Sequence, residues 1–249
     1  MTSPLEILFL SVVTFLCSIL TVVAGAGGGM VLLAVMIQFV PPAIAIPAHG
    51  VVQVAANSTR TWLFRHHVAW PLIWRFALLL PPGIAVGLLV FQGLPQHVVK
   101  LLIGCFVLVT LFSGRFTATR DKSMPLWAFI PLGFANGVLN MVVGVIGPVI
   151  AAFVVRTNIR KEGVVGTMGV FGLMGNFAKI VGFTYAGFSF YEFWPLLVMT
   201  VPAAILGMNV GKRLLWRFTE QTFRKLLQSV LVALAAKMIV YDGLGWIWL

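Results

Sequence analysis

The residues from Ile7 to Thr59 form a stretch of 53 residues without a single Asp, Glu, Lys or Arg. As one helix this stretch would be about 80 Å long, whereas the hydrocarbon core of a bilayer is about 30 Å thick. It must therefore cross or re-enter a membrane more than once. Further apolar segments follow it, so the sequence predicts an all-α polytopic membrane protein with about 8–10 hydrophobic helical segments.

The composition supports this class along the whole chain. Charged residues make up 9% of the sequence and hydrophobic residues 60%, whereas a soluble domain carries about 25% charged residues. The net charge of +11 does not indicate nucleic-acid binding, because the basic residues lie in short loops between apolar runs, as in the cytoplasmic loops of membrane proteins. We expect residues 1–249 to form a single transmembrane transporter domain.

Glycine and proline interrupt the apolar segments at defined places. Residues 25–29 break the first apolar run, and Pro41, Pro42 and Pro47 break it again. Segment 125–155 is too long for one upright helix and too short for two full spans. Its glycines and Pro148 therefore predict a broken or re-entrant helix pair.

The order of glycines and polar residues along the chain predicts an internal duplication. Matching positions recur at offsets of 117 to 125 residues, in the same order, which predicts one repeat over about 5–115 and a second over about 124–242. The best matches are Gly27 to Ala34 with Gly144 to Ala151, Gly50 with Gly169, Asn57 with Asn176, and Arg60 with Lys179.

The basic loops alternate out of phase between the two repeats. They are loops 60–67 and 115–122 in the first half, and loops 156–161 and 212–225 in the second. Inverted-topology repeats predict this pattern if all basic loops face the cytoplasm. Each half would then cross an odd number of times, either as three crossings plus a re-entrant hairpin or as five crossings. Both chain termini would lie outside.

Lys179 is the polar residue that is hardest to explain inside an apolar segment. The sixteen residues before it and the twelve after it are uncharged, and a lysine at mid-membrane costs about 2.5–3.5 kcal/mol on insertion scales. Three interpretations stay open: it anchors an anionic substrate, it extends its amine to the membrane surface, or it forms an ion pair. No carboxylate lies near it in its own segment, which weakens the third.

Asn176 lies three residues before Lys179, on the same helical face, and Asn57 and Arg60 repeat this spacing in the first half. Two such pairs facing each other would form a basic, hydrogen-bonding pocket at the membrane midplane. For Arg60 the alternative is an approach to the cytoplasmic surface, because Arg65 follows closely.

The glycine clusters form a second candidate element of the site. Unwound helix ends at these clusters would direct N–H groups at an anion, whereas the alternative is close helix packing. The glycines concerned are Gly27, Gly28, Gly29, Gly144 and Gly147.

Four further polar residues could add hydrogen bonds to the site, or could be ordinary contacts between helices. They are His49, Gln53, Asn136 and Asn140. No His, Cys and carboxylate cluster has metal-ligand spacing, and six acidic residues give acid–base catalysis little to work with. We therefore expect no metal, no cofactor and no enzymatic activity.

Several motifs together resemble the TauE/SafE sulfite exporter family. They are Gly25-Ala-Gly-Gly-Gly-Met, Pro47-Ala-His-Gly-Val, Asn57-Ser58, Pro82-Gly-Ile-Ala-Val-Gly87 and the turn from Gly93 to Pro95. The resemblance covers nearly the whole chain. It implies a carrier of the bacterial inner membrane, built from two repeats with about eight spans, for sulfite, organosulfonates and related sulfur anions. The family's usual picture, with both termini in the cytoplasm, conflicts with the charge pattern.

These observations favour a secondary transporter that exports a small sulfur-containing anion by alternating access at a midplane site. Its partners would be the small anionic substrate and the lipid bilayer, and the sequence permits a homodimer without requiring one. Two other hypotheses remain: a non-transporting membrane scaffold, and a carrier of the same fold for a non-anionic solute. An intramembrane enzyme is a weaker hypothesis, because no catalytic constellation is present.

Overall fold

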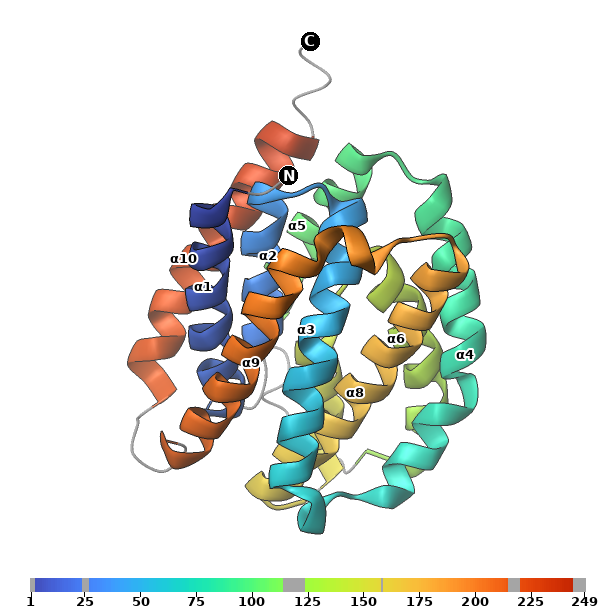
Figure 1. Cartoon of the computed structure of the whole chain (residues 1–249). Helices are drawn as coiled ribbons and strands as arrows, with labels where there is room; N and C mark the ends of the chain where they lie inside the picture. The colour runs from blue at the N-terminus through green and yellow to red at the C-terminus, as the bar shows by residue number, and fades with distance from the viewer. Residues whose placement is uncertain (1–2, 24–26, 114–123, 158, 215–219, 244–249) are drawn as a thin grey trace.

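The computed structural model describes residues 3–23, 27–113, 124–157, 159–214 and 220–243, which form helices joined by short turns (Figure 1). The first five helices are α1 (Pro4–Val23), α2 (Gly28–Phe39), α3 (Pro42–Leu63), α4 (Trp70–Gly93) and α5 (Gln96–Ser113). The next five are α6 (Phe129–Val142), α7 (Gly147–Val154), α8 (Lys161–Tyr185), α9 (Trp194–Leu214) and α10 (Glu220–Lys237). Short 3₁₀ turns cover Arg65–His67, Leu126–Ala128, Val155–Thr157 and Phe190–Phe193, and a π-helical turn covers Met238–Gly243. The described residues contain no strand, so the predicted all-α polytopic class is confirmed.

Four described stretches are long and apolar enough to cross a bilayer by themselves. They are α1, α4, α8 and the segment Phe190–Leu214 that contains α9. Helix α3 is as long, with 22 residues, but its hydropathy is lowered by a row of polar side chains. Prolines inside α3, α4 and α9 are compatible with spanning helices, because neighbouring helices can satisfy the freed backbone groups.

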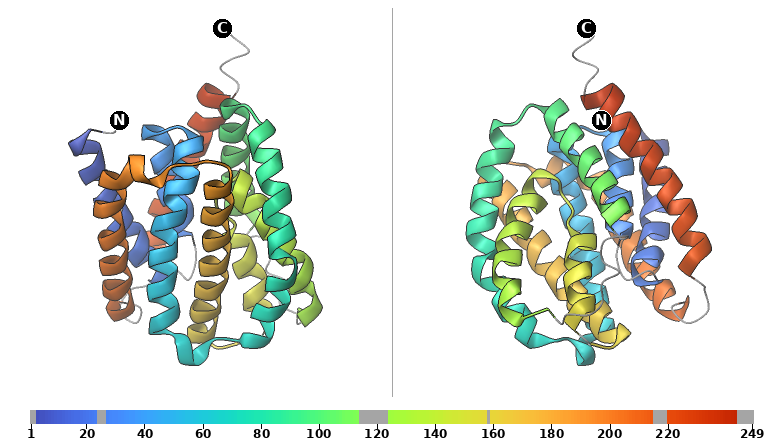
Figure 2. Two further views of the ribbon diagram at one scale, coloured as in Figure 1. Left: turned by 45° about the vertical axis from the view of Figure 1, so that its right-hand side comes forward. Right: turned by 180° about the vertical axis from the view of Figure 1, so that it is seen from behind.

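The molecule has two chemically different ends. Helix α1 begins and α10 ends at one end, which we call the terminal end, whereas the turns after α3, α7 and α9 lie at the other, the basic end (Figures 1 and 2). The described cations at the basic end include Arg65, Arg156, Arg160, Lys161, Lys212 and Arg213. Exposed tryptophans at this end, Trp62, Trp74 and Trp127, are typical of a membrane–water interface.

Two helix pairs turn back inside the protein. Helices α1 and α2 form a hairpin from the terminal end, whereas α6 and α7 form one from the basic end (Figures 1 and 2). The backbone N–H of Met124 donates a hydrogen bond of 3.1 Å to the carbonyl of Arg156, which closes the base of the second hairpin. Segment 125–155 is therefore a broken helix pair that enters and leaves at the same end, as its glycines predict.

Glycines allow the outer helices to pack at backbone distance. A Cβ atom on Gly133 of α6 would lie 2.0 Å from the carbonyl oxygen of Phe76 in α4, and one on Gly207 of α9 would lie 2.4 Å from that of Phe15 in α1. No larger residue fits at either point. The seams α4–α6 and α1–α9 thus follow the small-residue packing that is common in membranes.

Helices α3 and α8 pack together at the centre (Figure 1). Glycine recurs at every third residue of α8, at positions 163, 166, 169, 172 and 175. These five positions are called the glycine ridge. Gly169 and Gly172 contact Thr61 and Asn57 of α3, and Gly163 and Gly166 contact His67 and Phe64 in the turn that follows α3. The ring of Phe171 packs 4.3 Å from that of Phe76 and 5.9 Å from that of Phe129, which holds α8 against α4 and α6.

Candidate substrate site

A row of polar side chains lies on one face of α3. His49, Gln53, Asn57 and Arg60 follow each other at spacings of four, four and three residues, so they share that face. All four are buried. Because buried polar groups are costly inside a membrane, their direction toward the protein interior identifies this face of α3 as the candidate site.

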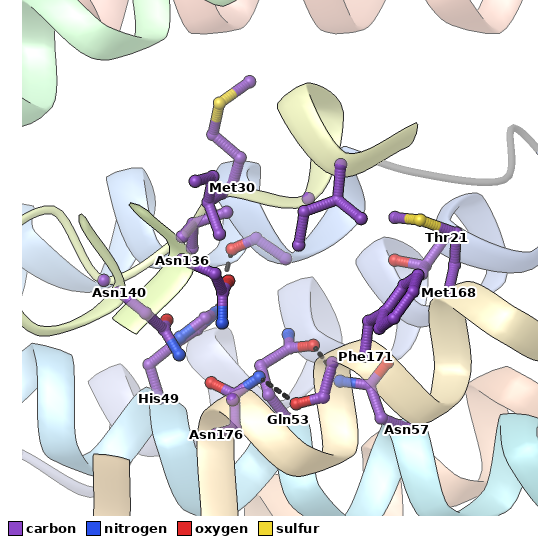
Figure 3. A pocket seen from close by; sticks show the side chains of 18 of the residues that line it. Thr21, Met30, His49, Gln53, Asn57, Asn136, Asn140, Met168, Phe171 and Asn176 are labelled. Carbon is purple, nitrogen blue, oxygen red and sulfur yellow. Dashed lines mark hydrogen bonds between the residues drawn. The ribbon is translucent and has the colours of Figure 1, made fainter. Parts of the chain in front are cut away.

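Helices α6 and α8 add four more buried polar side chains opposite this face. Asn136 and Asn140 are one turn apart on α6, and Asn176 and Lys179 are three residues apart on α8. Of these eight residues, all except Lys179 line one cavity. Figure 3 shows His49, Gln53, Asn57, Asn136, Asn140 and Asn176 around it.

Several of these polar side chains find room because a glycine lies opposite them. A Cβ on Gly172 would lie 2.7 Å from the amide atoms of Asn57, and one on Gly175 would lie 2.7 Å from Nδ2 of Asn136. A third glycine, Gly50 of α3, would place a Cβ 2.8 Å from Cε of Lys179. The glycine ridge was not recognised in the sequence as part of the site, although its period of three was a visible signal.

The tips of the two hairpins complete the site. Gly27 and Gly144 lie at these tips with φ angles of +104° and +82°, a conformation that favours glycine. Helix α2 begins directly after the first tip, and α7 begins at Gly147. Gly28 differs from the other predicted glycines, because it packs against the Cys17 carbonyl of α1 and does not line the cavity.

These elements line a cavity of about 70 Å³, enough for a few water molecules or one small ion. Its polar wall comprises Thr21, His49, Gln53, Asn57, Arg60, Asn136, Asn140 and Asn176 (Figure 3). Glycines 27, 29, 144, 147, 172 and 175 line it as well, and its apolar wall comprises Met30, Val145, Ile146, Ile150, Met168 and Phe171. None of these lining residues is acidic, and Arg60 carries the fixed positive charge of the wall.

Four buried polar atoms of the wall have no hydrogen-bond partner within the described protein. They are Nδ1 of His49, Nε of Arg60, Nδ2 of Asn136 and Oδ1 of Asn176. Buried polar groups are almost always paired, so an unpaired set around one cavity indicates a ligand or ordered water. The Nε2 atom of His49 donates to the carbonyl of Gly29 at 2.9 Å, which fixes the ring and directs Nδ1 elsewhere.

Lys179 lies behind the cavity wall and is fully buried. Its ammonium donates to the carbonyl of Gly144 at 3.1 Å and to Oδ1 of Asn140 at 3.4 Å. It therefore does not reach the membrane surface, and no described acidic residue forms an ion pair with it. In this conformation it binds the tip of the α6–α7 hairpin.

Comparison with known proteins finds one matching family and one similar protein with a curated description. The profile of the family described as "Sulfite exporter TauE/SafE" matches residues 10–238. The chain is also similar to a protein of Haemophilus influenzae described as "Probable membrane transporter protein", with 25% identity over 246 residues that cover 94% of each chain. No solved structure matches the chain.

Proposed function

Because this chain belongs to the TauE/SafE sulfite exporter family, we propose that it exports a small sulfur-containing anion, such as sulfite or an organosulfonate. The family consists of multi-pass membrane transporters. The observation that carries the substrate class is the cavity wall, which contains Arg60, a histidine and amide side chains and has no acidic residue.

Electrostatics favours an anion in this cavity over a cation or a neutral solute. A buried charge without a partner is costly in a membrane protein. Arg60 lines the cavity without a described carboxylate partner, and the ammonium of Lys179 lies directly behind the wall. A bound anion would compensate these charges, whereas a cation would add to them.

The packing of α3 on α8 supports two inverted repeats, at about 5–115 and 124–242. Lys179 packs over Gly50, and Arg60 lies next to Gly169, with 3.4 Å between Nε and the position of a Cβ. The predicted repeats match Gly50 with Gly169 and Arg60 with Lys179. Exchange of the two halves therefore converts each of these contacts into the other. The outer helices follow the same rule, because α4 packs on α6 and α9 packs on α1.

The two hairpins suit an alternating-access mechanism. Their tips meet the cavity from opposite ends, and each tip has a glycine in a left-handed conformation at which the backbone can bend. Rocking of one repeat against the other would open the cavity to one side and then to the other. Export of an anion needs no coupling ion in principle, because an inside-negative potential favours it by about 2.3 kcal/mol per charge per 100 mV.

We further propose that the basic end faces the cytoplasm and that both termini lie outside. The described loops at that end carry most of the exposed cations, as the positive-inside rule requires. A reporter fused after Leu249 tests this orientation. Activity that requires a periplasmic location is expected, and activity only in the cytoplasm would contradict it.

The test of the transport proposal is the thermal stability of the purified protein in detergent with a panel of anions. Sulfite, sulfate, thiosulfate, sulfoacetate, taurine and chloride form the panel. A ligand at one hundred times its dissociation constant adds about 2.7 kcal/mol to stability. We expect a selective shift with one sulfur anion.

Two variants locate the effect. Arg60→Gln removes the cation of the wall and should abolish the shift. Arg65→Gln removes a cation from the exposed turn after α3 and should keep it. The absence of a shift with every anion would contradict an anion carrier, and would favour a scaffold or a carrier of a non-anionic solute.

A further inference from the structure

We propose that the paired amide groups of Asn136 and Asn140 bind the oxygen atoms of the anion, and that Lys179 is the positioning residue that orients Asn140. This inference rests on the proposed function, because it needs an anion in the cavity. It assigns the anion a place in the cavity next to the two amide groups that pack against Gly175 of α8, and it gives Lys179 a role other than direct contact.

The orientation of the Asn140 amide follows from its partner. An ammonium group can only donate hydrogen bonds, so Asn140 must turn Oδ1 toward Nζ of Lys179. The NH₂ group of Asn140 therefore points the other way, toward α8. A Cβ on Gly175 would lie 3.1 Å from this Nδ2 atom.

The amide of Asn136 converges on the same point. Its Nδ2 atom would lie 2.7 Å from a Cβ on Gly175. It is buried and has no partner within the described protein. Both asparagines line the cavity. Two NH₂ groups, one helical turn apart, thus pack against the same glycine in the cavity wall, where there is no room for a side chain.

This geometry suits the oxygen atoms of a sulfite or sulfonate group. Each NH₂ group offers hydrogen atoms without adding charge, so the two can hold neighbouring oxygens of one anion. Hydrogen bonds to an ionised acceptor are shorter and stronger than neutral ones. The charge of Lys179 reaches the anion through the Asn140 amide, whose dipole it aligns.

Asn140→Asp separates this role from a purely structural one. The substitution keeps the shape of the side chain and an acceptor for Lys179, so the contact behind the wall becomes an ion pair. The NH₂ group is replaced by a carboxylate oxygen that faces the cavity. We expect a melting temperature without anion that equals or exceeds that of the wild type, and a dissociation constant for the anion at least tenfold higher.

Gln38→Glu is a matched control. Oε1 of Gln38 accepts a hydrogen bond from Lys237, so this change also turns a lysine-bound amide into a carboxylate, but outside the cavity. We expect it to keep the anion response of the wild type. If Asn140→Asp keeps that response too, the inference is wrong and Asn140 only anchors Lys179.

A double-mutant cycle tests the positioning role of Lys179. Lys179→Met and Asn140→Leu should each weaken anion binding, and the loss in the double variant should be smaller than the sum of the two single losses. Effects on the dissociation constant that simply add would mean that Lys179 acts through its charge alone, and would overturn the positioning role.

Gly175→Ala tests the place of the anion without changing any polar residue. Its methyl group would lie 2.7 Å from Nδ2 of Asn136 and 3.1 Å from Nδ2 of Asn140, so both amide groups must shift. The anion response should fall while the protein stays folded, and an unchanged response would overturn the proposed place of the anion. A wild-type protein that responds to no anion would instead refute the proposed function itself.

Discussion

Gly172→Ala is the substitution that most directly connects the packing of α8 to substrate binding. A Cβ at this position would lie 2.7 Å from Cγ, Nδ2 and Oδ1 of Asn57. Ordinary van der Waals contact begins at 3.4 Å, so the Asn57 amide must move back by about 0.7 Å. The group in the way is the end of a side chain, so α3 and α8 need not separate.

The expected effects on binding and on stability differ. Displacement of Asn57 stretches its hydrogen bond to Oε1 of Gln53, which is already 3.4 Å long, and removes one donor to the anion. A hydrogen bond to a charged group contributes about 1.5–3 kcal/mol, so binding should weaken roughly 10- to 150-fold. The gain in helix propensity, about 1 kcal/mol, offsets part of the packing cost of about 1–3 kcal/mol.

Calorimetric titration of the anion that stabilises the wild type measures this effect. Gly93→Ala is the matched control, because a Cβ there has no atom within 4 Å. We expect the control to bind like the wild type. A folded Gly172→Ala protein with an unchanged dissociation constant would show that Asn57 does not contribute to the site.

Two further predictions concern packing and substrate choice. Gly137→Ala would place a Cβ 2.5 Å from backbone atoms of Gly83 and Ile84 in α4, which cannot rotate away. We expect a loss of about 1–3 kcal/mol in unfolding free energy, measured by denaturation with and without anion. An unchanged denaturation midpoint would contradict the close α4–α6 seam. Nδ2 of Asn176 donates to the Gly172 carbonyl at 2.7 Å, which leaves Oδ1 as an unpaired acceptor at the cavity. An anion with a hydroxyl group should therefore bind more tightly than its analogue without one. In calorimetry, 2-hydroxyethanesulfonate should bind more tightly than ethanesulfonate by about 0.5–1.5 kcal/mol. Asn176→Leu should remove this difference.

The helices of the fold could be predicted because length and polarity limit what an apolar segment can do in a bilayer. Segment 125–155 is the clearest case, since only a broken pair satisfies both its length and its glycines. The packing partners of the helices could not be predicted in the same way. The apolar face of α4 would fit many neighbours, and its contact with α6 depends on glycines whose close approach exists only in three dimensions.

The candidate site was predictable in its polar residues and not in their contacts. Helical spacing alone places Asn57 with Arg60, and Asn176 with Lys179. It does not say what each side chain meets. The ammonium of Lys179 is held by Asn140 and by the carbonyl of Gly144, which are 39 and 35 residues away in the sequence. That contact depends on the fold of the α6–α7 hairpin.

The different surroundings of the two cations have a consequence for the transport cycle. Arg60 and the position of Gly50, over which Lys179 packs, are ten residues apart on α3, or about 15 Å along the helix. The cations therefore lie toward opposite ends of the α3–α8 pair. Arg60 faces the cavity, whereas Lys179 is sealed by the tip of the α6–α7 hairpin. If the two halves are related repeats, as proposed, identical states would treat their cations alike. The difference then fits a transporter that is closed on the Lys179 side. If the halves exchange roles, as proposed, the opposite state releases Lys179 to the cavity and holds Arg60 at the tip of the α1–α2 hairpin.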